Sequence, residues 1–263
     1  MEVTTSPDGT RIAFWREGSG PPLLMVHGGV CDHLAWYFVV PLLSRSFTVY
    51  TFDRRGRGGS SDAQPATVEG EVDDIAAMLQ SIGEPAHLLG HSAGGILALK
   101  AAMRVGNLLS LILYEPAFVV EGARERPAPA VLESMRALLA VGNRAEVVRI
   151  AMRESVGLSE AEIAAMEAGP GWHHLCGVAH AIPNDWLLWE ERFDAQSVKA
   201  IQTPTLLLAG SESPSWLRQA ASTVADALPS ARQAVLAGQA HSAMITAPEL
   251  FAQAVTTFAL QSN

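Results

Sequence analysis

The chain has 263 residues, 49% of them hydrophobic, a formal net charge of −9 and an isoelectric point near 5.3. This length suits one large α/β domain or a domain with an insertion, and an acidic chain without a basic cluster is a poor partner for nucleic acid or an anionic membrane. Apolar stretches are too short for a membrane span, the first residues lack signal-peptide features, and Cys31 and Cys176 make no disulfide framework. We therefore expect a cytoplasmic protein.

Most of the chain alternates short apolar runs with segments of helical spacing. The turn at Pro7-Asp8-Gly9 predicts an N-terminal hairpin, and the continuous apolar runs that follow are typical of parallel strands covered on both faces. In chain order, we expect strands at 3–5, 10–15, 23–26, 47–52, 86–89, 108–114, 204–209 and 231–236, with helices inside 32–43 and at 68–82, 96–103, 216–228 and 248–260.

This alternation stops between residues 117 and 199. The stretch contains helical patterns at 127–139, 144–155 and 159–168, then a tryptophan-rich segment, and it has no strong strand. We predict a helical cap at 117–199, inserted after the sixth strand into a core formed by 1–116 and 200–263. The core should be a mostly parallel, twisted sheet with helices on both faces, and therefore of the α/β class.

The segment Gly90-His91-Ser92-Ala93-Gly94 lies between a predicted strand and a predicted helix. A serine on so sharp a turn is strained and exposes its hydroxyl above the sheet. Positions two before and two after the serine are crowded, which favours glycine. The first amides of the helix point to the space beside the hydroxyl, where an oxyanion could form. This pattern indicates a nucleophile elbow.

Other motifs also follow predicted strands, at the edge where α/β sheets hold their sites. They are His27-Gly28-Gly29, Asp53-x-Arg55-Gly56-x-Gly58-x-Ser60 and Gly238-x-x-His241. Together with the elbow, they make the chain resemble the α/β-hydrolase superfamily over nearly its whole length. The resemblance implies an α/β-hydrolase fold, with Ser92 as nucleophile, His241 as base, and the backbone amides of Gly29 and Ala93 as the oxyanion hole. A serine hydroxyl needs such a base, held in one tautomer by a carboxylate.

The carboxylate is where the chain departs from this superfamily. The usual Gly-x-x-Asp pattern after the seventh strand is replaced by Gly210-Ser211-Glu212-Ser213. Some members, including certain haloalkane dehalogenases and lactone hydrolases, place the acid after the sixth strand, and here that residue is Glu115. The order Ser92, Glu115, His241 keeps the family's order of nucleophile, acid and base. We favour Glu115, with Glu212 as the alternative.

The remaining candidate site residues concern the substrate pocket. We expect Val30, His91, Trp172, Trp186 and Trp189 to line it, although each tryptophan could instead pack within the cap. His173 and His174 could contact substrate, Asp53, Arg55 and Ser60 should knit a loop by hydrogen bonds and a charge pair, and Cys31 is expected to be a small buried residue.

These residues predict a cofactor-independent serine hydrolase that acts on a small, largely apolar ester or lactone through an acyl-enzyme. Carbon–carbon cleavage of a diketone and perhydrolysis use the same residues and remain alternatives. A ligand-binding, receptor-like relative with little turnover is an alternative of another class. No metal-ligand spacing and no dinucleotide motif is present, so we expect no metal and no cofactor. The partner is a small-molecule substrate, and the choice between monomer and homo-oligomer stays open.

Overall fold

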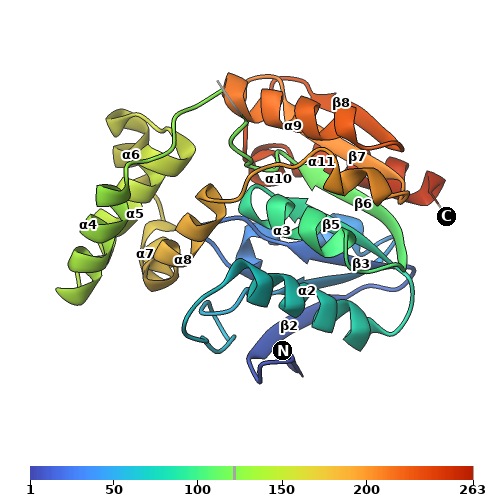
Figure 1. Cartoon of the computed structure of the whole chain (residues 1–263), viewed down its shortest axis with the longest axis horizontal. Coiled ribbons are helices and arrows are strands. Elements are labelled where there is room, and N and C mark those ends of the chain that lie inside the picture. Colours follow the sequence, from blue (N-terminus) through green and yellow to red (C-terminus); the bar gives the residue numbers. More distant parts are fainter. Residues whose placement is uncertain (121–122, 263) are drawn as a thin grey trace.

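A computed structural model describes residues 1–120 and 123–262. Within these residues, eight strands form one sheet in the order β1-β2-β4-β3-β5-β6-β7-β8 (Figure 1). The first two strands pair antiparallel to their neighbours, and the pairings from β4 to β8 are parallel. The strands are β1 (Glu2–Thr5), β2 (Arg11–Glu17), β3 (Pro22–Val26), β4 (Thr48–Phe52), β5 (Ala86–His91), β6 (Leu108–Tyr114), β7 (Thr205–Gly210) and β8 (Ala231–Leu236).

Strand register brings the candidate site residues to one edge of the sheet. His91 at the end of β5 pairs with Tyr114 at the end of β6, and Tyr114 pairs with Leu208 of β7. Because these parallel strands end at the same level, the residues that follow them meet above the sheet. Ser92 and Glu115 are therefore neighbours in space although 23 positions separate them in the chain.

Helices cover both faces of the sheet because alternate strand residues point to opposite sides. Leu24 and Leu88 point to the face covered by α2, α3 and α9, whereas Leu23 and Leu89 point to the face covered by η1, α1, α10 and α11. Their bounds are α1 (Val40–Leu43), α2 (Val68–Ile82), α3 (Ala93–Ala102), α9 (Ser215–Ala227), α10 (Ala243–Thr246), α11 (Pro248–Gln261) and the 3₁₀ turn η1 (His33–Trp36). The predicted class, a mostly parallel sheet between helical layers, is confirmed.

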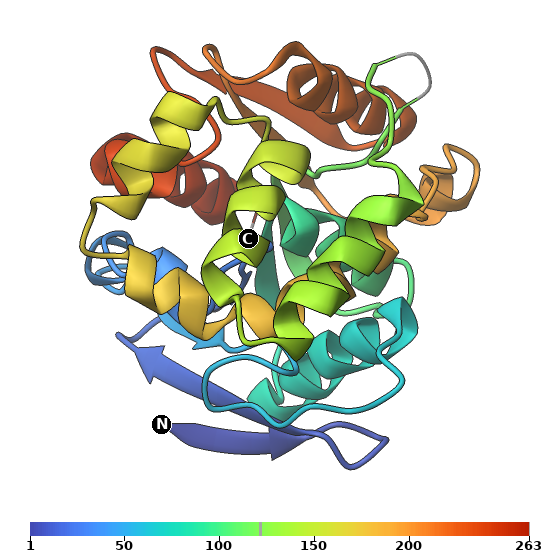
Figure 2. The same cartoon turned by 90° about the vertical axis from the view of Figure 1, so that its left-hand side faces the viewer.

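The stretch between β6 and β7, called the cap below, contains helices and short turns in its described part. Its elements are α4 (Pro129–Ala140), α5 (Arg144–Ala151), the π turn η2 (Met152–Val156), α6 (Glu160–Glu167), α7 (Trp172–Gly177), η3 (Ala179–Ala181), α8 (Ile182–Asp185), η4 (Trp186–Trp189) and η5 (Ser197–Ala200). Figure 1 shows α4 to α8 on the left, beyond the edge of the sheet that carries the site, and Figure 2 shows these helices in front of the sheet.

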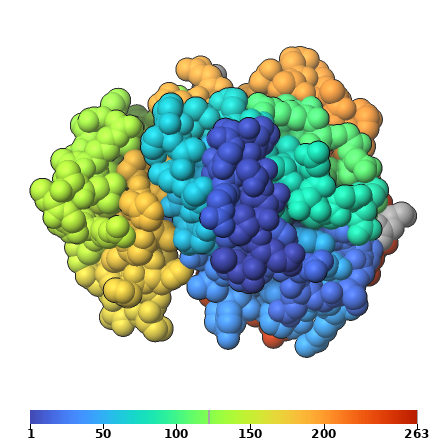
Figure 3. Space-filling model, turned by 90° about the horizontal axis from the view of Figure 1, so that it is seen from below, coloured from blue at the N-terminus to red at the C-terminus, as the bar shows by residue number. Residues whose placement is uncertain are grey.

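The cap has an apolar cluster of its own, which includes Met135, Val147, Ile163 and Trp186. Figure 3 shows the cap helices from below as the yellow-green side of the molecule, with the dark-blue N-terminal hairpin across the middle. The residue limits 117–199 stay a prediction, and residues 121 and 122 within them lie outside the described residues.

Sequence patterns located the strands well but missed details of the helices. The helix expected within 32–43 is α1, which has only four residues, and the 3₁₀ turn η1 precedes it. The helix expected at 144–155 ends at Ala151 and continues as the π turn η2, a distortion that periodicity does not reveal.

Candidate active site

Ser92 occupies the sharp turn between β5 and α3, and its φ angle is 54°. A Cβ on Gly94 would lie 2.3 Å from the Val26 carbonyl oxygen, and one on Gly90 would lie 2.4 Å from the Gly94 oxygen. Both distances are too short for any side chain, so the backbone can turn this tightly only with glycine at these positions. The expected elbow geometry is present.

His241 and Glu115 are in direct contact at the site. The Nδ1 atom of His241 lies 2.5 Å from Oε2 of Glu115, a carboxylate that is fully buried. The other oxygen, Oε1, accepts a hydrogen bond of 2.7 Å from the Gly210 amide. The last residue of β7, just before the loop that carries the acid in the usual pattern, thus gives a backbone donor to Glu115.

Glu212 lies elsewhere. Its side chain is exposed and accepts a hydrogen bond from the Ser211 hydroxyl, and the described residues contain no hydrogen bond between Glu212 and His241. Its backbone amide instead donates to the Gln239 carbonyl, 2.9 Å away. Of the two candidate acids, the structure brings Glu115 against the histidine.

Two aromatic side chains hold the loop that carries His241. His91 Nε2 lies 2.9 Å from the His241 carbonyl oxygen, and the Tyr114 hydroxyl donates to the Ala240 carbonyl and accepts from the Ala243 amide. Burial lowers the pKa of His91 well below its usual value, and the neighbouring His241 lowers it further. His91 is therefore neutral, and its Nε2 proton can be donated to the loop.

Three non-glycine residues of the described chain have positive φ angles, and all three lie at this site: Val30 (55°), Ser92 (54°) and Glu115 (45°). A bulky residue in this region costs about 1–3 kcal/mol and persists only where its surroundings hold it. Backbone strain is therefore concentrated at the three residues whose turns orient the loop after β3, the Ser92 hydroxyl and the Glu115 carboxylate.

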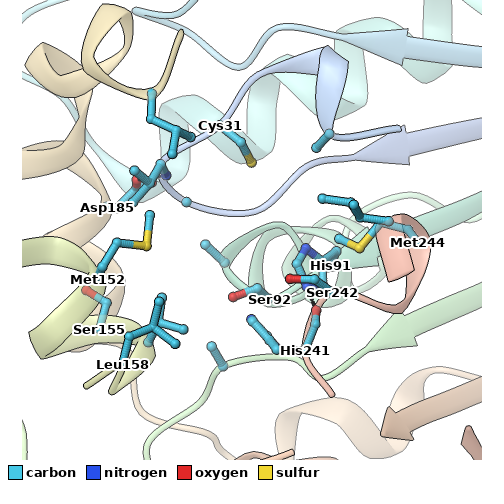
Figure 4. A pocket seen from close by; sticks show the side chains of 18 of the residues that line it. Cys31, His91, Ser92, Met152, Ser155, Leu158, Asp185, His241, Ser242 and Met244 are labelled. Atoms are coloured by element: carbon cyan, nitrogen blue, oxygen red, sulfur yellow. Dashed lines mark hydrogen bonds between the residues drawn. The ribbon is translucent and has the colours of Figure 1, made fainter. Parts of the chain in front are cut away.

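A cavity of about 880 Å³ opens beside Ser92, between the sheet edge and the cap (Figure 4). Figure 4 shows Ser92 and His241 at one wall, with Met152, Ser155 and Leu158 of the cap facing them. Gly29 and Ala93 also line it, and within the described residues neither of their backbone N–H groups has a hydrogen-bond acceptor. Val30, His91, Trp172, Trp186 and Trp189 all line the cavity, and the cap tryptophans also pack in the cap's own cluster.

Of the other residues singled out in the sequence, some line the cavity and some hold the loop after β4. His174 lines the cavity and lies 2.9 Å from Asp32, and Cys31 lines it with a thiol whose pKa burial raises to about 12, so that this thiol stays protonated. Hydrogen bonds do hold the loop 53–60 together: the Gly59 amide donates to the Asp53 carboxylate, and the Ser60 hydroxyl donates to the Asp53 carbonyl. The expected charge pair has a different partner, because Arg55 binds Asp74 of α2.

Asp32, His33 and Asp53 come together near the pocket, with potential ligand atoms within 4.8 Å of one another. The Asp53 oxygens already accept hydrogen bonds from His33 and from the Gly59 amide, and Asp32 accepts from the Leu34 amide and contacts His174. These bonds account for the cluster as a polar network that positions the loops.

Sequence reasoning missed Tyr114, Asp185 and the two buried arginines Arg54 and Arg57. Asp185 accepts a hydrogen bond from the Val30 amide and contacts both arginines. Arg54 and Arg57 lie within the motif at 53–60, which is visible in the sequence. No local pattern around Asp185 links it to Val30, 155 positions earlier.

Comparison with known proteins agrees with this geometry. The model of the "Alpha/beta hydrolase family" matches residues 23–254. The chain belongs to the α/β hydrolase family. A crystal structure of an alpha/beta hydrolase from Sphaerobacter thermophilus is 35% identical, covers 98% of this chain and 99% of its own, and superposes with a TM-score of 0.91. The α/β-hydrolase fold expected from the motifs is confirmed.

Two further relatives are more distant or match only in part. A thermophilic esterase from Thermogutta terrifontis is 25% identical, with coverage of 99% and 98% and a TM-score of 0.74. The "Probable oxidoreductase EphD" of Mycobacterium tuberculosis is 41% identical over 101 residues, which are 36% of this chain and 17% of that protein. The α/β hydrolase described here therefore spans only a small part of that relative. In the part of this chain that the structure describes, every helix is too short or too polar to span a membrane.

Proposed function

We propose that this α/β hydrolase is a cofactor-independent serine hydrolase of neutral, largely apolar esters or lactones. The observation that carries the proposal is the 2.5 Å contact between Glu115 and His241 at the cavity that Ser92 lines. A buried carboxylate on Nδ1 leaves Nε2 of the imidazole free to accept a proton. The similarity to a solved esterase is consistent with this chemistry.

In the proposed reaction, the Ser92 hydroxyl attacks the substrate carbonyl carbon while His241 takes its proton. The Gly29 and Ala93 amides stabilise the oxyanion of the tetrahedral intermediate. Collapse of this intermediate breaks the bond to the alkoxy group, which leaves as an alcohol with the proton from His241. Water, deprotonated by His241, then attacks the acyl-enzyme and forms a second tetrahedral intermediate. When this intermediate collapses, the bond to the Ser92 oxygen breaks, the acid is released, and His241 returns the proton to Ser92.

The charges around the cavity support a neutral substrate. Its carboxylate-bearing lining residues are Asp32, Asp185 and Glu212, and no lysine or arginine of the described chain lines it. Arg54 and Arg57 lie behind the wall, buried and paired with acids. A carboxylate on the acyl chain would lose its hydration without gaining a cation, which is strongly unfavourable.

A matched pair of substrates tests this proposal. The para-nitrophenyl ester of hexanoic acid and the para-nitrophenyl monoester of adipic acid have acyl chains of equal carbon number, and only the second carries a carboxylate. We expect kcat/KM for the neutral ester to be higher by about tenfold or more, since burying an unpaired charge costs several kcal/mol. Ser92→Ala is the control and should hydrolyse neither. Preference for the charged ester would contradict the proposed substrate class.

A further inference from the structure

Asp185 links the cap to the loop that carries Gly29. It is the last residue of α8 and is 8% exposed, and Figure 4 shows its side chain on the cap side of the pocket. Its Oδ1 atom lies 2.7 Å from an Arg57 nitrogen and 3.0 Å from an Arg54 nitrogen. Its Oδ2 atom accepts the Val30 amide at 3.3 Å. One cap carboxylate therefore contacts both the buried arginines and the loop after β3.

The two peptide groups that flank Gly29 are fixed from opposite sides. The Gly28 carbonyl accepts hydrogen bonds from Arg54 Nη1 at 3.1 Å and His27 Nδ1 at 2.8 Å. Because a trans peptide directs N–H and C=O to opposite sides, these bonds set the direction of the Gly29 N–H. The next peptide is held through the Val30 N–H, which Asp185 accepts.

His27 is suited to this task because it is neutral. Burial lowers the pKa of His27 well below its usual value, and the nearby arginines lower it further. Its Nε2 accepts the Arg54 backbone amide at 3.1 Å, so the proton is on Nδ1 and is donated to the Gly28 carbonyl. The core side of the loop is thus fixed by Arg54 and His27.

Asp185 restrains the cap side of the loop. Val30 is β-branched and has a φ angle of 55°, a conformation that needs external restraint. A Cβ on Gly29 would lie only 3.0 Å from Asp185 Oδ2, so the carboxylate lies directly against this glycine. Without Asp185, the Val30 amide would lose its acceptor. Arg54 would keep Glu71 as an acid partner, whereas Arg57 would lose the acid that it contacts in the described chain.

We propose that Asp185 is a positioning residue, through which the cap holds the Gly29 N–H in the orientation that stabilises the oxyanion. The inference rests on the proposed serine hydrolase function. Asp185 itself need not touch the reacting atoms. It fixes the peptide next to the donor, and its ion pair with Arg54 joins the two restraints into one network.

The test compares Asp185→Ala, Asp185→Asn and Asp74→Asn in the 263-residue protein with para-nitrophenyl hexanoate. We expect Asp185→Ala to lower kcat by about 10- to 100-fold, because a misplaced oxyanion donor costs less than the roughly 100- to 1,000-fold loss of a missing one, with KM changed less than about threefold. Asp185→Asn should recover part of kcat, because its amide oxygen can still accept the Val30 N–H.

Asp74→Asn is the matched control. Asp74 is also a buried aspartate that binds an arginine, Arg55, through two hydrogen bonds of 2.7 Å, yet it does not line the cavity and has no contact with Arg54 or Arg57 among the described residues. Its kcat should stay within about threefold of wild type even if the free energy of unfolding falls by as much as in the Asp185 variants. Wild-type kcat in Asp185→Ala, or an equal loss of kcat in Asp74→Asn, would overturn the inference.

If Asp185→Ala does not fold, the comparison of Asp185→Asn with Asp74→Asn decides the question, since both replace a buried aspartate that pairs with arginine by an amide of the same size. The rate of Ser92 labelling by a fluorophosphonate separates the two proposals. A wild-type protein that is not labelled contradicts the serine hydrolase function. A wild type that is labelled, together with Asp185 variants labelled equally fast, contradicts only the positioning role.

Discussion

At the scale of single residues, the acid of the site is set by backbone geometry. Glu115 follows β6 with a φ angle of 45°, and its amide donates to the Leu208 carbonyl at 3.0 Å. This strained turn directs one carboxylate oxygen to His241 and the other to the Gly210 amide. Gly210 cannot be replaced easily, because a Cβ there would lie 2.2 Å from the Gln239 oxygen.

Glu115→Gln should lower kcat by about 100-fold or more, because an amide cannot hold the imidazole in the required tautomer or stabilise the imidazolium. Steady-state kinetics with para-nitrophenyl hexanoate measure this loss. Glu212→Gln is the control and should keep kcat within about twofold, since an exposed carboxylate contributes little to a distant charge. Loss of kcat in Glu212→Gln alone would reverse the assignment of the acid.

At the scale of elements, the elbow joins β5 and α3 through a close approach of backbones. Gly94 is the second residue of α3 and lies against the Val26 and His27 carbonyl groups at the end of β3. The same contact sets the height of Ser92 above the sheet and the direction of the first helix amides. Stability and the position of the proposed nucleophile therefore depend on the same glycine.

Gly94→Ala should destabilise the protein by about 2 kcal/mol or more, because the added methyl group overlaps the Val26 and His27 carbonyl oxygens. Gly106→Ala is the matched control: its Cβ would meet no atom within 4 Å, so the change should be below about 0.5 kcal/mol. Urea unfolding followed by circular dichroism measures both. Equal stability of the two variants would show that the backbone at the elbow is not close-packed.

Sequence patterns could predict the elements that depend on local or periodic signals. Continuous apolar runs marked the parallel strands, and the glycines around Ser92 marked the elbow. A helix within 32–43 was predictable, but the short length of α1, the 3₁₀ turn η1 and the π turn η2 were not, since tertiary packing rather than periodicity decides them. Glu115 could be preferred over Glu212 by register alone, but its contact with His241 needed the fold.

At the scale of the whole molecule, the site is assembled from segments far apart in the chain. The loop after β3, the elbow, the β6 turn and the loop after β8 all meet at one edge of the sheet, and the cap covers them (Figure 2). Such long-range contacts leave no local signal, which is why Tyr114 and Asp185 escaped the sequence analysis. The cavity is lined by residues of both the core and the cap, so its shape depends on the whole molecule.

The most direct test of the central claim is reaction with a fluorophosphonate at neutral pH, read by intact mass and peptide mapping. Wild type should give one adduct, located on Ser92, because His241 activates this hydroxyl and the amides of Gly29 and Ala93 stabilise the phosphoryl oxygen. His241→Ala should react far more slowly, and Ser92→Ala should not react. An unlabelled wild type, or an adduct that forms equally fast in His241→Ala, would contradict the account.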